Sequence, residues 1–98
     1  MNKKKIVHVI CWSGIEIEVS YCPQWSTAVH NLAHLEIKTI DGSALPITET
    51  GYRSHFLDIE TIEAEGGAVA YALKWLDQEA KNKKWKDYLT QQNQLSLF

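Results

Sequence analysis

Histidine is the side chain best suited to bind a metal or to act as a base near neutral pH, and the sequence holds four of them. His30 and His34 lie four residues apart in the segment HNLAH. On a helix this spacing would bring both rings to one side, within reach of a single metal ion. On a strand the same residues would lie about 13 Å apart and could not share one. Asn31 stands where the H-E-x-x-H zinc hydrolases carry their glutamate base, so we expect no metal site here.

A second group of reactive side chains lies in TETGYRSHF, residues 48–56, which we interpret as a loop. In such a loop Arg53 could bind an anion and His55 could act as a base. The structural alternative is that Tyr52 and Phe56 anchor a long connection while Arg53 pairs with an acid at the edge of the core. We favour the structural interpretation and keep Arg53 and His55 as a possible ligand loop.

The sequence offers little else that could perform catalysis. No nucleophile–base pair or carboxylate dyad can be assembled at a recognisable spacing, so we expect a protein that is not an enzyme and that needs no cofactor. Cys22 has no obvious basic neighbours and is not expected to act as a nucleophile. The rival interpretation is a small metal-dependent hydrolase in which His34, His55 and a nearby acid such as Glu36 converge.

The most specific motif is QLSLF, residues 94–98, at the end of the sequence. It resembles the short peptide by which many bacterial DNA polymerases and repair factors dock on the ring-shaped sliding clamp of the replicase. The resemblance implies that the partner-binding residues are Gln94, Leu95, Leu97 and Phe98. The amide of Gln94 can donate and accept hydrogen bonds at the rim of a pocket, and Leu97 and Phe98 could fill an apolar cleft.

Charge is unevenly spread along the chain, whose net charge is −2. Lysines crowd both ends, whereas between Ile6 and Leu73 only Lys38 and Arg53 oppose nine acids. A general nucleic-acid binder concentrates positive charge on one face, so direct binding of nucleic acid is not expected. The central acids suggest an alternative function, inhibition of a host defence nuclease (anti-restriction or anti-CRISPR type) by imitation of nucleic acid. The acids that could align on one sheet face are Glu16, Glu18 and Glu36.

The start of the sequence, MNKKKIVHVICWSG, briefly resembles a signal peptide. His8 interrupts its apolar run, and Glu16 and Glu18 follow in place of small residues. No segment approaches the roughly 20 apolar residues of a membrane span. We therefore expect a cytoplasmic protein with reduced thiols and no membrane partner.

The segment KIVHVICWSGIEIEVSYC, residues 5–22, predicts a β-hairpin. A two-residue loop of Ser13 and Gly14 would place Trp12 opposite Ile15 and Ile6 opposite Tyr21. In this register His8 is the only polar member of a face that otherwise carries Ile6, Ile10, Trp12, Ile15, Ile17, Val19 and Tyr21.

Alternation continues in AHLEIKTI, residues 33–40, which predicts a third strand whose Lys38 could pair with Glu16 or Glu18. Residues 43–58 are loop-like with room for one short strand, which Pro46 would confine to an edge.

The remainder is helical, and Gly66-Gly67 interrupts any helix that begins at Thr61. One apolar stripe at helical spacing follows, formed by Val69, Ala72, Leu73, Leu76 and Ala80.

Trp85 does not continue this stripe, because nine steps of about 100° from Leu76 lead to the opposite side of a continuous helix. Either the helix breaks near Asn82, or Trp85 and Leu89 face something other than the main core. In the second case the QLSLF tail could fold back and cover them.

The predicted fold is α+β: a three- to four-stranded antiparallel sheet in the order β-β-β-(β)-α-α, with helices packed on one face. We expect one domain over residues 1–90 and a C-terminal tail over residues 91–98. The oligomeric state is left open.

Three segments carry a second resemblance: HLEI (34–37), LPITETGYRSHF (45–56) and GGAVAYALKWLDQEA (66–80). They are similar to a group of small uncharacterised proteins of bacterial plasmids and other mobile elements, over about residues 12–80. The resemblance implies a setting and no particular reaction. Together with the tail, it predicts a small interaction protein of mobile-element type that docks on the sliding clamp.

Overall fold

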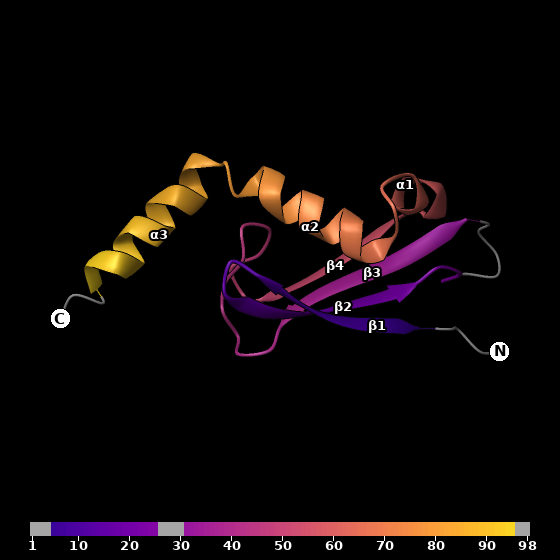
Figure 1. Ribbon diagram of the computed structural model, residues 1–98, viewed down its shortest axis with the longest axis horizontal. Helices are drawn as coiled ribbons and strands as arrows, with labels where there is room; N and C mark the ends of the chain where they lie inside the picture. Colours follow the sequence, from indigo (N-terminus) through magenta and orange to yellow (C-terminus); the bar gives the residue numbers. More distant parts are fainter. Residues whose placement is uncertain (1–4, 26–30, 96–98) are drawn as a thin grey trace.

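The computed structural model describes residues 5–25 and 31–95, with side chains described as far as Gln91. Four strands form one antiparallel sheet in the order β1-β2-β3-β4. They are β1 (Ile6–Trp12), β2 (Ile15–Cys22), β3 (Leu32–Thr39) and β4 (Tyr52–Asp58). The helices are α1 (Ile59–Ala64), α2 (Ala68–Glu79) and α3 (Lys83–Leu95). Figure 1 shows α1 and α2 above one face of the sheet and α3 beyond its end, so the predicted α+β fold is confirmed.

The hairpin has the predicted register. Trp12 pairs with Ile15 and Ile6 with Tyr21, and each pair between them also follows the prediction. Ser13 and Gly14 have φ values of 51° and 80°, and two consecutive positive values are what a type I′ turn requires. This turn matches the right-handed twist of the strands that it joins, and so the local sequence determines the register of the whole hairpin.

The third strand joins the hairpin as expected, with Lys38 directly opposite Glu18 on β2. The segment after it differs from the prediction, because residues 52–58 form a full seven-residue strand at the edge of the sheet. Pro46 lies in the connection before β4 and places no limit on it. Arg53 and His55 therefore do not form a loop: both lie in β4, where pairing with β3 satisfies the backbone that a loop would leave to solvent.

The core lies between the sheet and the helices. α2 contributes Ala72 and Leu76, both fully buried, while Val69, Leu73 and Ala80 of the predicted stripe are partly buried. The other fully buried side chains come from the sheet and α1: Ile17, Val19, Ala33, Leu35, Ile37 and Ile62.

The helix does break near Asn82, as the first of the two alternatives predicts. α2 ends at Glu79, and the Asn82 side chain accepts a hydrogen bond of 2.8 Å from the backbone N–H of Lys84 at the start of α3. This is the bond by which a side chain caps a helix N-terminus. The change of direction turns Trp85 onto Trp12 of β1, where it is buried. Trp85 consequently needs no tail to cover it.

Candidate interaction surfaces

The residues of the predicted ligand loop face α2 and are held there. The Arg53 guanidinium lies 5.5 Å from the centre of the Trp75 ring, and its Nη1 donates a hydrogen bond of 3.2 Å to the Ile47 carbonyl. The His55 ring lies 4.8 Å from that of Trp75 and stacks at 6.5 Å on Tyr71. Burial, and then the charge of Arg53, lower the pKa of His55 below its ordinary value. Arg53 thus donates its hydrogen bond to the Ile47 carbonyl and not to the expected acid. Through these contacts Arg53 and His55 connect β4 to α2.

His34 and His55 lie on opposite faces of the sheet. His34 is opposite Phe56, and its neighbour Leu35 is opposite His55. Successive residues of a strand alternate between faces, so the two imidazoles are separated by the sheet itself. The metal-binding set of His34, His55 and Glu36 is therefore wrong. His30, the other histidine of the HNLAH segment, lies outside the described residues.

His34 instead belongs to a cluster on the sheet face opposite the helices. Its Nε2 lies 2.6 Å from the hydroxyl of Ser54, and its Nδ1 lies 3.9 Å from the carboxylate of Glu36. The Tyr52 hydroxyl donates a hydrogen bond of 2.6 Å to Glu36 and is the main cause that lowers the pKa of this carboxyl. Lys5 adds a charge at 3.6 Å. We call these five residues the His34 cluster.

Aromatic rings cover the His34 imidazole. Phe56 stacks on it at 4.4 Å and Trp25 lies at 4.5 Å, which leaves His34 only 7% exposed. A pocket of about 310 Å³ opens beside the ring, lined by Lys5, Ser20, Cys22, Trp25, His34 and Glu36.

Ser54, His34 and Glu36 stand in the order nucleophile, base and acid of a hydrolytic triad. Acyl transfer also requires backbone N–H groups aimed at the developing oxyanion. The N–H of Ser54 itself faces away from the ladder, because Ser54 lies in the edge strand β4 in a pair without ladder bonds, and no described N–H group is placed around an oxyanion position near His34. The contacts of the His34 cluster order this face of the sheet and make it a candidate recognition surface.

The sequence carries only part of the signal for the His34 cluster, which was not predicted. The i, i+2 spacing of His34 and Glu36 places them on one face of any strand. Ser54 and Tyr52 join them only through the register of β4 on β3, which no local pattern specifies.

The three acids expected to align do share this open face, but cations interrupt them. Glu18 lies opposite Lys38, and Glu36 interacts with Lys5. Glu16 is exposed. An unbroken row of negative charge, as on a nucleic-acid mimic, is not formed along this part of the sheet.

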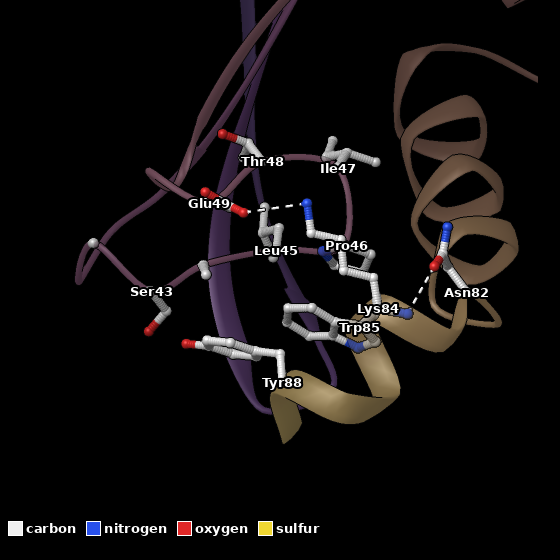
Figure 2. A pocket seen from close by; sticks show the side chains of 12 residues that line it. Ser43, Leu45, Pro46, Ile47, Thr48, Glu49, Asn82, Lys84, Trp85 and Tyr88 are labelled. Atoms are coloured by element: carbon white, nitrogen blue, oxygen red, sulfur yellow. Dashed lines mark hydrogen bonds and ion pairs between the residues drawn. The ribbon is translucent and has the colours of Figure 1, made fainter. Parts of the chain in front are cut away.

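A groove of about 780 Å³ lies at the other end of the molecule, between residues 42–49 and the start of α3 (Figure 2). Leu45 and Ile47 give it an apolar floor, and Trp85 with Tyr88 stacked at 5.2 Å forms a wall. An ion pair of 3.5 Å between Lys84 and Glu49 crosses it. The groove therefore lies where the start of α3 meets the loop before β4.

The partner-binding residues predicted in the tail lie at and beyond the end of α3. The helix runs from Lys83 without interruption to Leu95, so the predicted boundary at residue 91 falls inside it. Gln94 and Leu95 close the helix, and Leu97 and Phe98 lie outside the described residues. Figure 1 shows α3 leading away from the sheet.

Among the described residues no helix is long and apolar enough to cross a membrane. Neither the curated proteins nor the solved structures contain a significant match to the chain. The family model described as the KlcB third domain matches residues 5–85, from the start of β1 to the first turn of α3, and KlcB is a plasmid-associated protein. The match agrees with the plasmid resemblance and stops short of QLSLF. Because it covers well over half of the 98 residues, the chain belongs to the KlcB third-domain family.

Proposed function

We propose that this plasmid-associated accessory protein is a non-enzymatic interaction module that docks on the bacterial DNA sliding clamp through residues 94–98. The observation that carries the proposal is the position of QLSLF at the end of α3, which contains Gln94 and Leu95 and leads away from the folded sheet. In this proposal the family domain is delivered to replicating DNA, and the tail makes the contact.

The anchoring of α3 supports a protruding role for the tail. Trp85 is buried at the start of the helix, whereas the other side chains described, Lys83, Lys84 and 86–91, are exposed. From Trp85 to Leu95 the helix rises about 15 Å at 1.5 Å per residue. The molecule is accordingly elongated, with extents of 52 × 22 × 19 Å. In this proposal the segment that follows such a helix enters a cleft on the partner without displacement of the core.

The energetics suit a modest, reversible contact. Burial of Leu97 and Phe98 removes on the order of 200 Å² of apolar surface from water, worth about 5 kcal/mol before ordering costs. Fixing the backbone of five residues costs roughly 5–10 kcal/mol. Polar contacts of Gln94 and the backbone must offset the difference. Phe98 should matter most, because it contributes the largest apolar surface.

The test is calorimetry of the intact protein with purified sliding clamp, beside a version truncated after Asn93. We expect binding by the intact protein, none by the truncated one, and at least about tenfold weaker binding by Phe98→Ala, since its transfer energy exceeds 1.4 kcal/mol. Leu89→Ala is the matched control, an exposed apolar residue of α3 outside the motif. Equal binding by intact and truncated protein, or by neither, would contradict the proposal.

A thermal melt of the same two proteins separates docking from self-packing. If the tail only covered its own domain, truncation would lower the melting temperature while the intact protein failed to bind the clamp. If the tail docks, truncation abolishes binding and leaves the melting temperature nearly unchanged.

The non-enzymatic character has its own test, metal analysis of protein purified without a histidine tag. We expect no stoichiometric metal. Stoichiometric zinc or manganese that is lost on His34→Ala would overturn this part of the proposal.

The second candidate is an inhibitor of a host defence nuclease, favoured by the shared face of Glu16, Glu18 and Glu36. Lys38 and Lys5 beside these acids weaken the case. Co-purification from the host discriminates the two functions: recovery of a restriction or CRISPR nuclease, in place of replication proteins, would favour inhibition.

A further inference from the structure

The outer edge of β1 is exposed and apolar. β1 ends the strand order on one side, and Ile6, Val7 and Val9 are 44%, 49% and 59% exposed. Between Ile6 and Trp12 the strand contains no lysine, arginine, aspartate or glutamate. Edge strands that stay single are usually protected by charge, proline or a bulge, because a bare edge is a template for a further strand.

The sequence of this edge is a palindrome, and this symmetry indicates that the same strand of a second copy fits it. Residues 6–10 read Ile-Val-His-Val-Ile in both directions. In an antiparallel pair centred on His8, Ile6 would lie opposite Ile10 of a second copy, and Val7 opposite Val9. Every side chain then meets one of its own chemistry across a twofold axis, which is the self-complementarity that a symmetric dimer requires.

The backbone presents its free groups in the same register. The carbonyl of Glu16 accepts a hydrogen bond of 3.0 Å from the N–H of Ile40, so it points away from β1. Its pairing partner Cys11 is therefore in a pair without ladder bonds, and it turns its own N–H and C=O outward. Because this direction alternates along a strand, Val9 and Val7 also turn their N–H and C=O groups outward. A pairing centred on His8 brings these outward groups of Val7 and Val9 opposite each other, so all of them are satisfied.

Charge favours the same pairing. The register centred on His8 also places Lys5 opposite Cys11 of the second copy, whose neighbour on β2 is Glu16. Lys5, Cys11 and Glu16 share the open sheet face, so Lys5, which already lies 3.6 Å from Glu36 of its own chain, is also in line with an exposed glutamate of the second copy. These two pairs are equivalent by the twofold axis.

The helices leave space for a second copy. α1 contacts β4 at the opposite edge, and α2 reaches β1 at its far end, where Trp12 bonds to Asp77. The half of β1 around the palindrome is exposed at Ile6, Val7, His8 and Val9.

We propose that the protein forms a twofold dimer through antiparallel pairing of β1 with β1 of a second copy, centred on His8. The two four-stranded sheets become one eight-stranded sheet.

Sedimentation velocity over a concentration series tests the association. We expect the mass to rise from one chain of 11.2 kDa toward twice that value. Val9→Lys should shift the midpoint about tenfold to higher concentration, because it removes the apolar contact with Val7 of the second copy and sets two like charges near the axis. Ile40→Lys is the control, a residue of similar exposure (56%) away from β1, and it should leave the midpoint unchanged. A chain that stays monomeric at all concentrations, or a dimer indifferent to Val9→Lys, overturns the proposal.

A disulfide test reads the register. In a Cys11→Ser background, His8→Cys places two thiols opposite each other at the axis, with Cα atoms about 4.5 Å apart. The control Val9→Cys separates its Cα atoms by about 8 Å, beyond the reach of a disulfide. Rapid oxidative cross-linking of the first and not the second is the expected result. Cross-linking of both alike, or of Val9→Cys alone, overturns the register.

Charge reversal gives an independent check. Lys5→Glu or Glu16→Lys alone should weaken the dimer about two- to fivefold, as for a partly exposed ion pair. The double variant should regain most of the loss, and failure to regain any would contradict the alignment of Lys5 with Glu16.

Discussion

Trp12 and Asp77 are joined by a hydrogen bond of 2.9 Å from the indole Nε1 to the carboxylate Oδ1. Trp12 ends β1 and Asp77 lies on α2, so the bond connects the hairpin to the main helix. The same indole packs on Trp85 of α3 at a ring distance of 6.3 Å. Trp12 is thus the point at which the sheet, α2 and α3 meet, and it holds the helix that leads to the tail.

Replacement of Trp85 should both destabilise the protein and detach α3. Trp85→Ala removes a buried ring and is expected to lower the free energy of unfolding by about 3 kcal/mol, measured by urea denaturation. Leu89→Ala, on the exposed part of the same helix, should cost under about 0.5 kcal/mol. Equal effects of the two variants would mean that Trp85 does not anchor α3.

Loss of the Asp77 carboxylate leaves the Trp12 indole N–H without its partner. We expect Asp77→Ala to lower the free energy of unfolding by about 1–2 kcal/mol and to alter the tryptophan fluorescence spectrum. Gln78→Ala, the exposed neighbour on α2, is the control and should change neither quantity. If Asp77→Ala left the free energy of unfolding unchanged, water would have replaced the carboxylate as the partner of the Trp12 indole.

Gly51 is a position where only glycine fits. Its φ is +81°, and an added Cβ would collide with the Thr39 hydroxyl and lie 2.8 Å from the Ser43 carbonyl. Gly51→Ala should therefore cost at least about 2 kcal/mol, measured as a fall in thermal stability. Gly14→Ala shares the positive φ but meets no atom within 4 Å, and should cost about 1 kcal/mol. A smaller loss at Gly51 than at Gly14 would contradict this close packing.

Acidification should destabilise the protein through His55. Its pKa is lowered in the folded state by burial and then by Arg53, whereas the unfolded chain protonates near the ordinary value of 6.5. Below that value the unfolded state binds more protons, so the free energy of unfolding falls as the pH drops through and below about 6.5. Denaturation curves from pH 7.5 to 5.5 should show this fall in the native protein and a smaller one in His55→Gln. Parallel curves for the two proteins would exclude His55 as the cause.

The open-face acid Glu36 titrates in a separate window. The hydrogen bond from Tyr52 lowers its pKa below the ordinary value of 4.5, so its contribution is present above about pH 4.5 and is lost in stronger acid. Tyr52→Phe should reduce the loss of stability in that acid range and leave the range from pH 7.5 to 5.5 unchanged. If Tyr52→Phe lost as much stability below about pH 4.5 as the native protein, other carboxylates would be the cause of that loss.

The sequence by itself determined the hairpin, because a strand repeats every two residues and the Ser13-Gly14 turn leaves one register that gathers the apolar side chains on one face. It also determined that the helical stripe cannot run from Leu76 to Trp85, since the geometry of a helix is local. Tertiary structure decided where the chain turned instead: the Asn82 cap and the Trp12 contact direct Trp85 into the core.

The candidate site depended still more on tertiary structure. The pattern around Arg53 and His55 is equally compatible with a loop or a strand, and only the pairing with β3 made it a strand and sent His34 and His55 to opposite faces. The same pairing brought Ser54 and Tyr52 to His34 and Glu36 across a sequence separation of 16 to 20 residues. Contacts within a hairpin or a helical turn follow from a short period in the chain, whereas contacts between distant strands depend on a register that the whole core selects.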